Sequence, residues 1–481
     1  MSNIHPSQLP LKHMNYSTML KPLSVFNKKS TIFGAITILT LSIVFFDAFI
    51  YDVLAYHGPF SVIATQVKGL SDFQLNQQLL DRFQGFPPFW RLALYPSFVI
   101  GWPRLMLLPN ILILSLLCWT IQKLKLLPWH LTVCTVFVFP VCLFSFRSGY
   151  QDFFVGATVS SSLVLLLYSI YHRKLSVTIL ALLLSTFSSY TKYQGFMQSF
   201  LVVIVGYIAL LFSHYASMKD HIFNKQCLIL LTFGLLLTSS HSIWNFLIYS
   251  NPFYPISVGP FEGPESNYTA SSTYTSFLYP LQGSLNHFLS SSELDWIFRG
   301  VVPDYNIDMA RAQTQYGGLL DPKNAMGLVR TGGTYGPAYL AAFLVFMYGI
   351  LEKLRNLFTV KSIDGHDFLF LMTGIYVLLA SFLPQSHELR YYLSIFMLIS
   401  IFSIYYLCQT NQIKVVRAAL FLFLSISCVL NFSQPFYSTA KNGIGYAVSY
   451  PSRDLPTTQD CLSKPDSEDP ATRFACKLIL R

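Results

Sequence analysis

The chain has 481 residues, of which 53% are hydrophobic and only 11% are charged, and its mean hydropathy is +0.47. Because a soluble domain carries about 25% charged residues, this composition excludes a water-facing surface over most of the length. The formal net charge of +10 comes without a dense Lys/Arg block, which argues against a nucleic-acid partner and for basic loops beside a membrane. The sequence therefore predicts an all-α polytopic membrane protein.

Apolar runs recur along the chain at close to the length of a membrane-spanning helix, about 20 residues for a ~30 Å hydrocarbon core. The predicted spans are 31–50, 104–121, 129–146, 153–171, 176–191, 196–213, 227–248, 335–352, 367–383, 391–408 and 417–433. They define three regions: an N-terminal tail (1–30), a transmembrane domain (31–433) and a C-terminal tail (434–481).

Basic residues mark alternate connections between these eleven spans. They are Lys12, Lys21, Lys28, Lys29, Lys123, Lys125, Arg173, Lys174, Lys219, Lys225, Lys353, Arg355, Lys361, Lys414 and Arg417. Since short cytoplasmic loops are rich in Lys and Arg, we expect the N-terminus inside and the C-terminus outside. The long loops 51–103 and 249–334 then also lie outside, and an extracytoplasmic tail would allow a disulfide between Cys461 and Cys476.

Ionisable and polar residues gather at the predicted outer ends of the spans. A charge near membrane depth is costly, so each one is a candidate functional residue. Besides the end of the first span, the relevant short loops read RSGYQD (147–152), TKYQG (191–195) and QSHELRYY (385–392). The candidates are Asp47, Tyr51, Arg147, Asp152, Lys192, Gln194, His387, Glu388, Arg390 and Tyr391. We expect these groups to converge on one cavity at the outer interface.

Several of these residues also have a purely structural interpretation. Lys192 and Arg390 could extend their charges to lipid headgroups, and residues 387–388 could cap a turn. Asp52 fits a solvated residue just beyond the first span. Asp47 lies one helical turn deeper, between Phe and Ala, so we expect it to have a partner or a function.

The candidate set has a consistent chemistry. Carboxylates act as general bases or hold a divalent cation, while Lys and Arg bind phosphate. A lipid-linked phosphosugar presents its phosphate at this depth. Asp47 or Asp152 would accept the proton of an acceptor hydroxyl, and Lys192, Arg390 or Arg147 would stabilise the leaving phosphate. A divalent cation is the only cofactor that this set suggests.

Short motifs in the same order resemble those of the GT-C superfamily of integral-membrane glycosyltransferases, in particular the bacterial branch related to aminoarabinose transferase and protein O-mannosyltransferases. DAFIY (47–51) is similar to the family's D-x-x-x-Y at the end of the first span. FPPFW (86–90) and WPRLMLLPN (102–110) resemble the stretch that closes the first outer loop, and ELRYY (388–392) resembles a later RY element. The similarity extends over residues 31–408.

This resemblance implies transfer of a sugar from a polyprenyl-phosphate donor to a lipid, glycan or protein acceptor, on the outer face of a bacterial inner membrane. Asp47 would be the catalytic carboxylate, and Asp152 would assist it or contact a metal or the acceptor. Lys192 and Arg390 would contact the donor phosphate. The implied acceptor or loop contacts are Tyr51, Gln194, His387, Glu388 and Tyr391.

The chain departs from the family pattern at two positions. Phe86 stands where the aminoarabinose-transferase branch has a Lys before the two prolines. Ala48 follows Asp47, so the Asp-Glu pair of the O-mannosyltransferases is absent. The first departure removes one expected phosphate contact.

Two other functions stay open at this point. An envelope-polysaccharide polymerase or ligase would place its chemistry in loop 249–334, at Arg299, Arg311 and Arg330, and would leave Asp47 dispensable. A non-enzymatic lipid or glycan transporter would need ionisable residues near the bilayer midplane, whereas those of this chain gather at one face.

Overall fold

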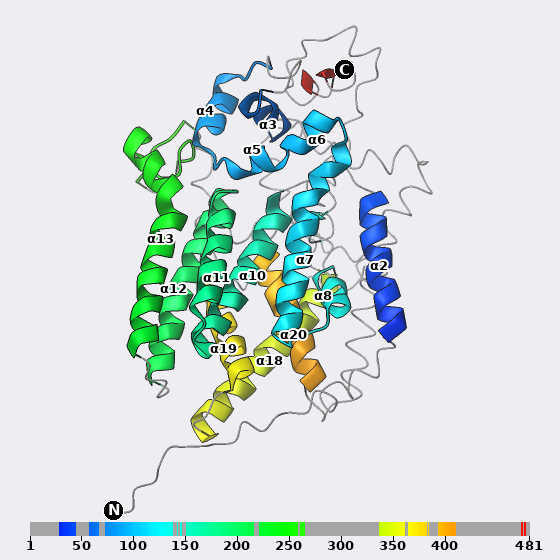
Figure 1. The fold of residues 1–481 in the computed structure, drawn as a ribbon, viewed down its shortest axis with the longest axis vertical. Helices are drawn as coiled ribbons and strands as arrows, with labels where there is room; N and C mark the ends of the chain where they lie inside the picture. Colours follow the sequence, from blue (N-terminus) through cyan, green and yellow to red (C-terminus); the bar gives the residue numbers. More distant parts are fainter. Residues whose placement is uncertain are drawn as a thin grey trace, which may run out of the picture.

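The computed structural model describes residues 28–44, 57–66, 73–137, 142, 145–146, 151–215, 221–257, 260–264, 336–360, 364–381, 383, 393–409, 473–474 and 476–477. This described part is helical, as the composition predicts (Figure 1). Its only other regular feature is a single bridge that pairs positions 256 and 261.

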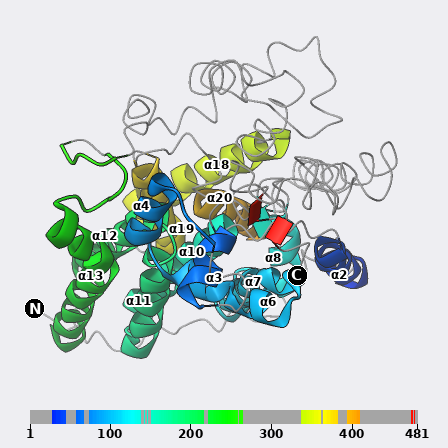
Figure 2. The same ribbon diagram turned by 90° about the horizontal axis from the view of Figure 1, so that it is seen from above.

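The helices form a bundle with a group of short helices at one end (Figures 1 and 2). The short ones are α3 (Gly58–Ala64), α4 (Gln77–Gly85), α5 (Phe89–Ala93), α6 (Tyr95–Ile100) and the 3-10 helix η3 (Pro103–Leu107). The bundle contains α2 (Lys28–Val44), α7 (Leu108–Lys123), α8 (Trp129–Val136), α10 (Gln151–His172), α11 (Leu175–Ser189), α12 (Tyr193–Tyr215), α13 (His221–Tyr249), α18 (Gly336–Val360), α19 (Gly365–Ala380) and α20 (Leu393–Gln409).

Four stretches of the described chain are long and apolar enough to cross a membrane, as expected of an integral membrane protein. They are Arg104–Lys123, Gln151–His172, Tyr193–Ser213 and Ile222–Tyr249. Described helices overlap every predicted span except 417–433, which lies outside the described residues. Several of them are apolar but only 10 to 17 residues long, so the total of eleven spans stays a prediction.

Helix α10 lies at the centre of the bundle and packs against α7, α11, α12, α19 and α20. Small residues allow this close packing. The Ser162 hydroxyl donates to the Ala181 carbonyl of α11 at 2.7 Å, and a Cβ at Gly156 would lie 2.7 Å from the Cβ of Leu393 on α20. The surrounding helices therefore fix the position of α10, whose first turn carries Gln151 and Asp152.

We call residues 57–66 and 73–107, which include the short helices α3 to η3, the cap. Two prolines and one glycine divide its second part: α5 begins after Pro88, η3 begins with Pro103, and α6 ends at Gly101 with a φ of +70°. The Ser61 hydroxyl donates to the Arg91 carbonyl at 2.6 Å and joins α3 to α5. The cap thus forms one packed unit over the end of the bundle.

Candidate functional site

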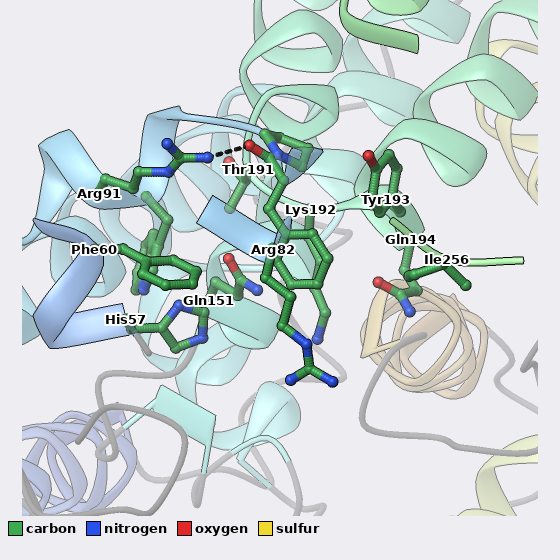
Figure 3. A pocket seen from close by; sticks show the side chains of 13 residues that line it. His57, Phe60, Arg82, Arg91, Gln151, Thr191, Lys192, Tyr193, Gln194 and Ile256 are labelled. Atoms are coloured by element: carbon green, nitrogen blue, oxygen red, sulfur yellow. Dashed lines mark hydrogen bonds between the residues drawn. The ribbon is translucent and has the colours of Figure 1, made fainter. Parts of the chain in front are cut away.

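A pocket lies between the cap and the adjoining ends of α10 and α12 (Figure 3). Its lining residues are His57, Phe60, Arg82, Phe86, Pro87, Trp90, Arg91, Gln151, Thr191, Lys192, Tyr193, Gln194 and Ile256. The cavity volume of about 60 Å³ suits a few water molecules or one small charged group. The described lining contains three cationic side chains and no carboxylate, which favours an anion.

Two of the three cations lie in the cap, on either side of the turn that joins α4 to α5. Asn76 directly precedes α4, and its Oδ1 accepts a hydrogen bond from the Leu79 amide at 2.9 Å, as is typical of an N-cap. Helix α4 ends at Gly85, because the following Phe-Pro-Pro sequence cannot continue a helix. Arg82 in the last turn of α4 and Arg91 in α5 therefore flank this turn.

Arg91 is held as a half-buried cation. Its Nη2 donates to the Phe86 carbonyl, and its guanidinium carbon lies 4.5 Å from the ring centroid of Phe83 and 5.8 Å from that of Phe60. Such cation–π contacts favour the charged form. Burial lowers the pKa of Arg91 to about 10, so the side chain still carries its charge at neutral pH.

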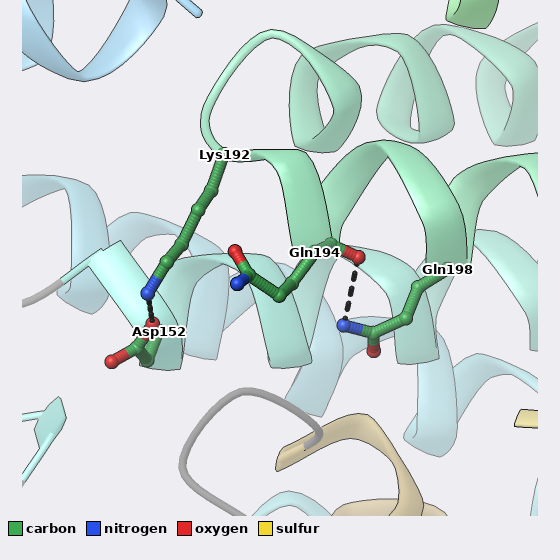
Figure 4. Close-up of polar contacts among 4 residues, drawn as sticks. All are labelled: Asp152, Lys192, Gln194 and Gln198. Atoms are coloured by element: carbon green, nitrogen blue, oxygen red, sulfur yellow. Dashed lines mark hydrogen bonds and ion pairs between the residues drawn. The ribbon is translucent and has the colours of Figure 1, made fainter. Parts of the chain in front are cut away.

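The third cation, Lys192, forms an ion pair with Asp152 (Figure 4). The Lys192 Nζ lies 2.5 Å from the Asp152 Oδ1, and the two side chains are 18% and 3% exposed. Lys192 lies in the α11–α12 turn, while Asp152 is in the first turn of α10. Asp152 belongs to a helix that is fixed by packing, and its carboxylate binds the Lys192 ammonium. Lys192 therefore has one defined orientation at the pocket wall.

His57, which directly precedes α3 in the cap, also lines the pocket and is buried. Burial and the neighbouring charge of Lys192 lower the pKa of His57 to about 3. The imidazole is therefore neutral at neutral pH. A negatively charged ligand would offset the surrounding cations and favour the protonated form.

The structure brings together some of the residues that the sequence predicts for the site. Asp152 and Lys192 come from different loops and form the ion pair, and Gln194 lines the same pocket. The residues of the set that lie outside the described part of the chain are Asp47, Tyr51, Arg147, His387, Glu388, Arg390 and Tyr391. Their convergence on this pocket stays a prediction.

Two further predictions concern the other long loop and the tail. Arg299, Arg311 and Arg330 also lie outside the described residues. Cys476 is disulfide-bonded, as the extracytoplasmic tail would allow. Its partner falls outside the described residues, so the pairing with Cys461 stays a prediction.

Sequence reasoning missed the two arginines and the histidine that the cap contributes. The predicted candidates are charged or polar residues at the ends of the apolar spans, whereas Arg82 and Arg91 lie within the long loop 51–103. The signal that could have found them is the arrangement RFQGFPPFWR (82–91), in which a Pro-Pro turn separates two arginines among aromatic residues. His57 has no comparable signal, because it reaches the pocket only through the packing of α3 on α5.

In the described part of the chain, no group of three or more His, Cys, Asp or Glu side chains is arranged to hold a metal ion. The chain matches no protein-family model, no curated protein and no solved structure. The geometry of the pocket and the resemblance of the motifs are therefore the grounds for a functional proposal.

Proposed function

We propose that this protein is a GT-C-like membrane glycosyltransferase that moves a sugar from a polyprenyl-phosphate donor to a lipid, glycan or protein acceptor. One observation carries the proposal. Arg82, Arg91 and Lys192 line a pocket at the end of an apolar helical bundle, and the described lining contains no carboxylate. The phosphate of a donor whose tail lies in the bilayer is an anion at this depth, and Arg and Lys are its usual ligands in proteins.

The reaction accounts for the excess of positive charge. The acceptor hydroxyl oxygen attacks the anomeric carbon, and the bond from that carbon to the phosphate oxygen breaks. The polyprenyl phosphate leaves as a monoester and gains one negative charge, while a carboxylate accepts the hydroxyl proton. Groups that bind the leaving phosphate more strongly than the donor diester lower the barrier. Arg82, Arg91 and Lys192 have this role in our proposal.

The carboxylates have different roles. Asp152 holds Lys192 at 2.5 Å and orients this phosphate contact. Asp47, which begins the D-x-x-x-Y motif, is the catalytic base in our proposal, and Arg390 and Arg147 are additional phosphate contacts. Tyr51, Gln194, His387, Glu388 and Tyr391 would contact the acceptor or the loops around it.

The distribution of basic residues supports a pocket on the outer face. Arg173 and Lys174 follow the end of α10 that lies away from the pocket, and Lys123 and Lys125 lie at the corresponding end of α7. Short loops rich in Lys and Arg are typical of the cytoplasmic side. We therefore propose a bacterial inner-membrane protein with eleven spans, its N-terminus inside and its C-terminus outside.

The proposal is tested by sugar release from a panel of polyprenyl-phosphate sugars. We expect release by the purified wild type and a loss of at least about 100-fold in Asp47→Asn, as is usual for a general base. Arg330→Ala serves as the comparison variant and should keep its activity. The reverse pattern, with activity lost only in Arg330→Ala, would favour the polymerase or ligase. If the wild type releases no sugar from any donor, the enzymatic proposal fails.

A further inference from the structure

The carbonyl oxygen of Gly85, in the turn between the two cap arginines, lies within hydrogen-bond distance of three side chains from the bundle. The Tyr193 hydroxyl lies at 2.6 Å, the Asn245 Nδ2 at 2.9 Å and the His241 Nε2 at 2.9 Å. A carbonyl only accepts, so the Nε2 of His241 carries the proton. Side chains of α12 and α13 thus fix the turn between α4 and α5 of the cap through hydrogen bonds to one carbonyl oxygen.

The Tyr193 hydroxyl also connects the cap to a second segment, residues 250–257 and 260–264. It contacts the Tyr254 carbonyl and accepts a hydrogen bond from the Asn245 Nδ2 at 2.7 Å. The Asn251 side chain holds this second segment together, since its Nδ2 donates to the Ile256 carbonyl at 2.9 Å and the Glu262 carbonyl at 3.0 Å. One phenol oxygen therefore lies where α12, the cap and this segment meet.

The junction is closely packed. A Cβ at Gly85 would lie 2.2 Å from the Tyr254 carbonyl oxygen, so only glycine fits without a shift of the backbone. The Tyr193 ring packs edge-on against the Phe86 ring at 5.8 Å between centroids. Displacement of the Gly85 turn would therefore move the Phe86 carbonyl, to which Arg91 donates.

We propose that Tyr193 is a positioning residue whose hydroxyl holds the Gly85 turn so that Arg82 and Arg91 face the pocket beside Lys192. The hydroxyl is engaged by two carbonyls and one amide, so it acts on a ligand through the two arginines. This inference depends on the proposed phosphate site for its effect on binding. Its effect on the turn itself is independent of that site.

The matched control is Tyr190, which directly follows the last residue of α11, whereas Tyr193 begins α12. Its hydroxyl bonds the Ser240 hydroxyl of α13 at 2.6 Å, and its side chain is not part of the pocket lining. Tyr193→Phe and Tyr190→Phe therefore each remove one phenol oxygen bonded to α13. Only Tyr193→Phe removes a hydrogen bond from the Gly85 carbonyl.

Hydrogen–deuterium exchange of residues 85–94 measures the effect on the turn. The Phe86 amide bonds the Arg82 carbonyl and the Phe89 amide bonds the Tyr190 carbonyl, both at 2.9 Å. We expect exchange of these amides to be about fivefold faster in Tyr193→Phe, because one hydrogen bond is lost from the held state, and unchanged in Tyr190→Phe. The affinity for undecaprenyl phosphate in lipid nanodiscs should fall by a similar factor in Tyr193→Phe alone.

Unchanged exchange in Tyr193→Phe overturns the inference, and so does faster exchange with undiminished affinity. If the wild type does not bind undecaprenyl phosphate, the proposed function fails, and the exchange contrast between the two variants alone decides whether Tyr193 holds the turn. Should Tyr193→Phe not fold, Asn245→Ala removes a second donor to the same carbonyl. It must then accelerate exchange of the Phe86 amide, or the inference is wrong.

Discussion

The ion pair between Asp152 and Lys192 allows a quantitative test of the site. In Asp152→Asn, the Lys192 ammonium would face a neutral amide where only 18% of its side chain is exposed. In Lys192→Met, a carboxylate that is 3% exposed would lose its counter-ion. Removal of one partner from a buried pair costs about 3–5 kcal/mol. We take the lower value for each variant, about 3 kcal/mol, because Lys192 keeps some contact with solvent.

The double variant separates a true pair from two independent effects. Because a buried ion pair can often be replaced by neutral residues at little cost, Asp152→Asn combined with Lys192→Met should lose about 1 kcal/mol or less, where additivity predicts about 6 kcal/mol. The free energies of unfolding are measured by denaturant titration in detergent micelles, which gives the coupling energy of the pair.

A second ion pair provides the control. The Lys353 Nζ lies 2.7 Å from the Asp367 Oδ1, with side chains that are 22% and 21% exposed. Its acid is more exposed than Asp152, so the same cycle with Lys353→Met and Asp367→Asn should give a coupling of about 1 kcal/mol or less, and one that falls with added salt. Additive losses at Asp152 and Lys192, or equal couplings for the two pairs, would refute the reasoning.

Three further changes have defined outcomes. In Gly85→Ala the new Cβ would lie 2.2 Å from the Tyr254 carbonyl oxygen, so the free energy of unfolding should fall by about 2–3 kcal/mol. In Gly34→Ala the new Cβ has nothing within 4 Å, so this variant should be neutral or stabilised by up to about 1 kcal/mol. Similar free energies of unfolding for the two variants would contradict the packing at Gly85. His57 has a pKa near 3 when folded and 6.5 when unfolded, so the unfolded state binds more protons between these values. The contribution of His57 to the free energy of unfolding is therefore present above pH 6.5 and falls by about 2 kcal/mol by pH 5. His57→Gln should remove this decline, which calorimetry above pH 6.5 and at pH 5 measures. Arg91→Lys keeps the charge but loses the contacts to Phe86 and the aromatic rings, so affinity for undecaprenyl phosphate should fall about tenfold; an unchanged affinity would exclude Arg91 from the pocket's function.

The sequence predicts the position of most helices because hydropathy reports directly on burial in an apolar surrounding. The ends are less well predicted, for a specific physical reason. The span expected at 153–171 is part of α10, Gln151–His172, and the span expected at 196–213 is part of α12, Tyr193–Tyr215. Asp152 and Gln194 lie in the first turns of these helices, where Asp152 pairs with Lys192 and Gln194 lines the pocket. A hydropathy profile assigns such polar residues to loops.

The same limit applies to the site. That Asp152 and Lys192 lie near each other follows from their places at the ends of adjacent spans. That they form a pair at 2.5 Å depends on the packing of α10, α11 and α12, which hydropathy does not report. The contribution of Arg82 and Arg91 depends on how the cap folds back over the bundle, and this is set by hydrogen bonds to Gly85 from residues more than 100 positions away.

The most direct test of the central claim is single-turnover sugar transfer by the purified protein in nanodiscs, with a panel of polyprenyl-phosphate sugars and Arg82→Gln beside wild type. Arg82 lines the pocket and is expected to bind the leaving phosphate through charge-assisted hydrogen bonds worth about 1.5–3 kcal/mol. The account predicts that the wild type releases sugar from at least one donor and that Arg82→Gln does so about 10- to 150-fold more slowly. Release at the same rate by both proteins, or by neither with any donor, would contradict it.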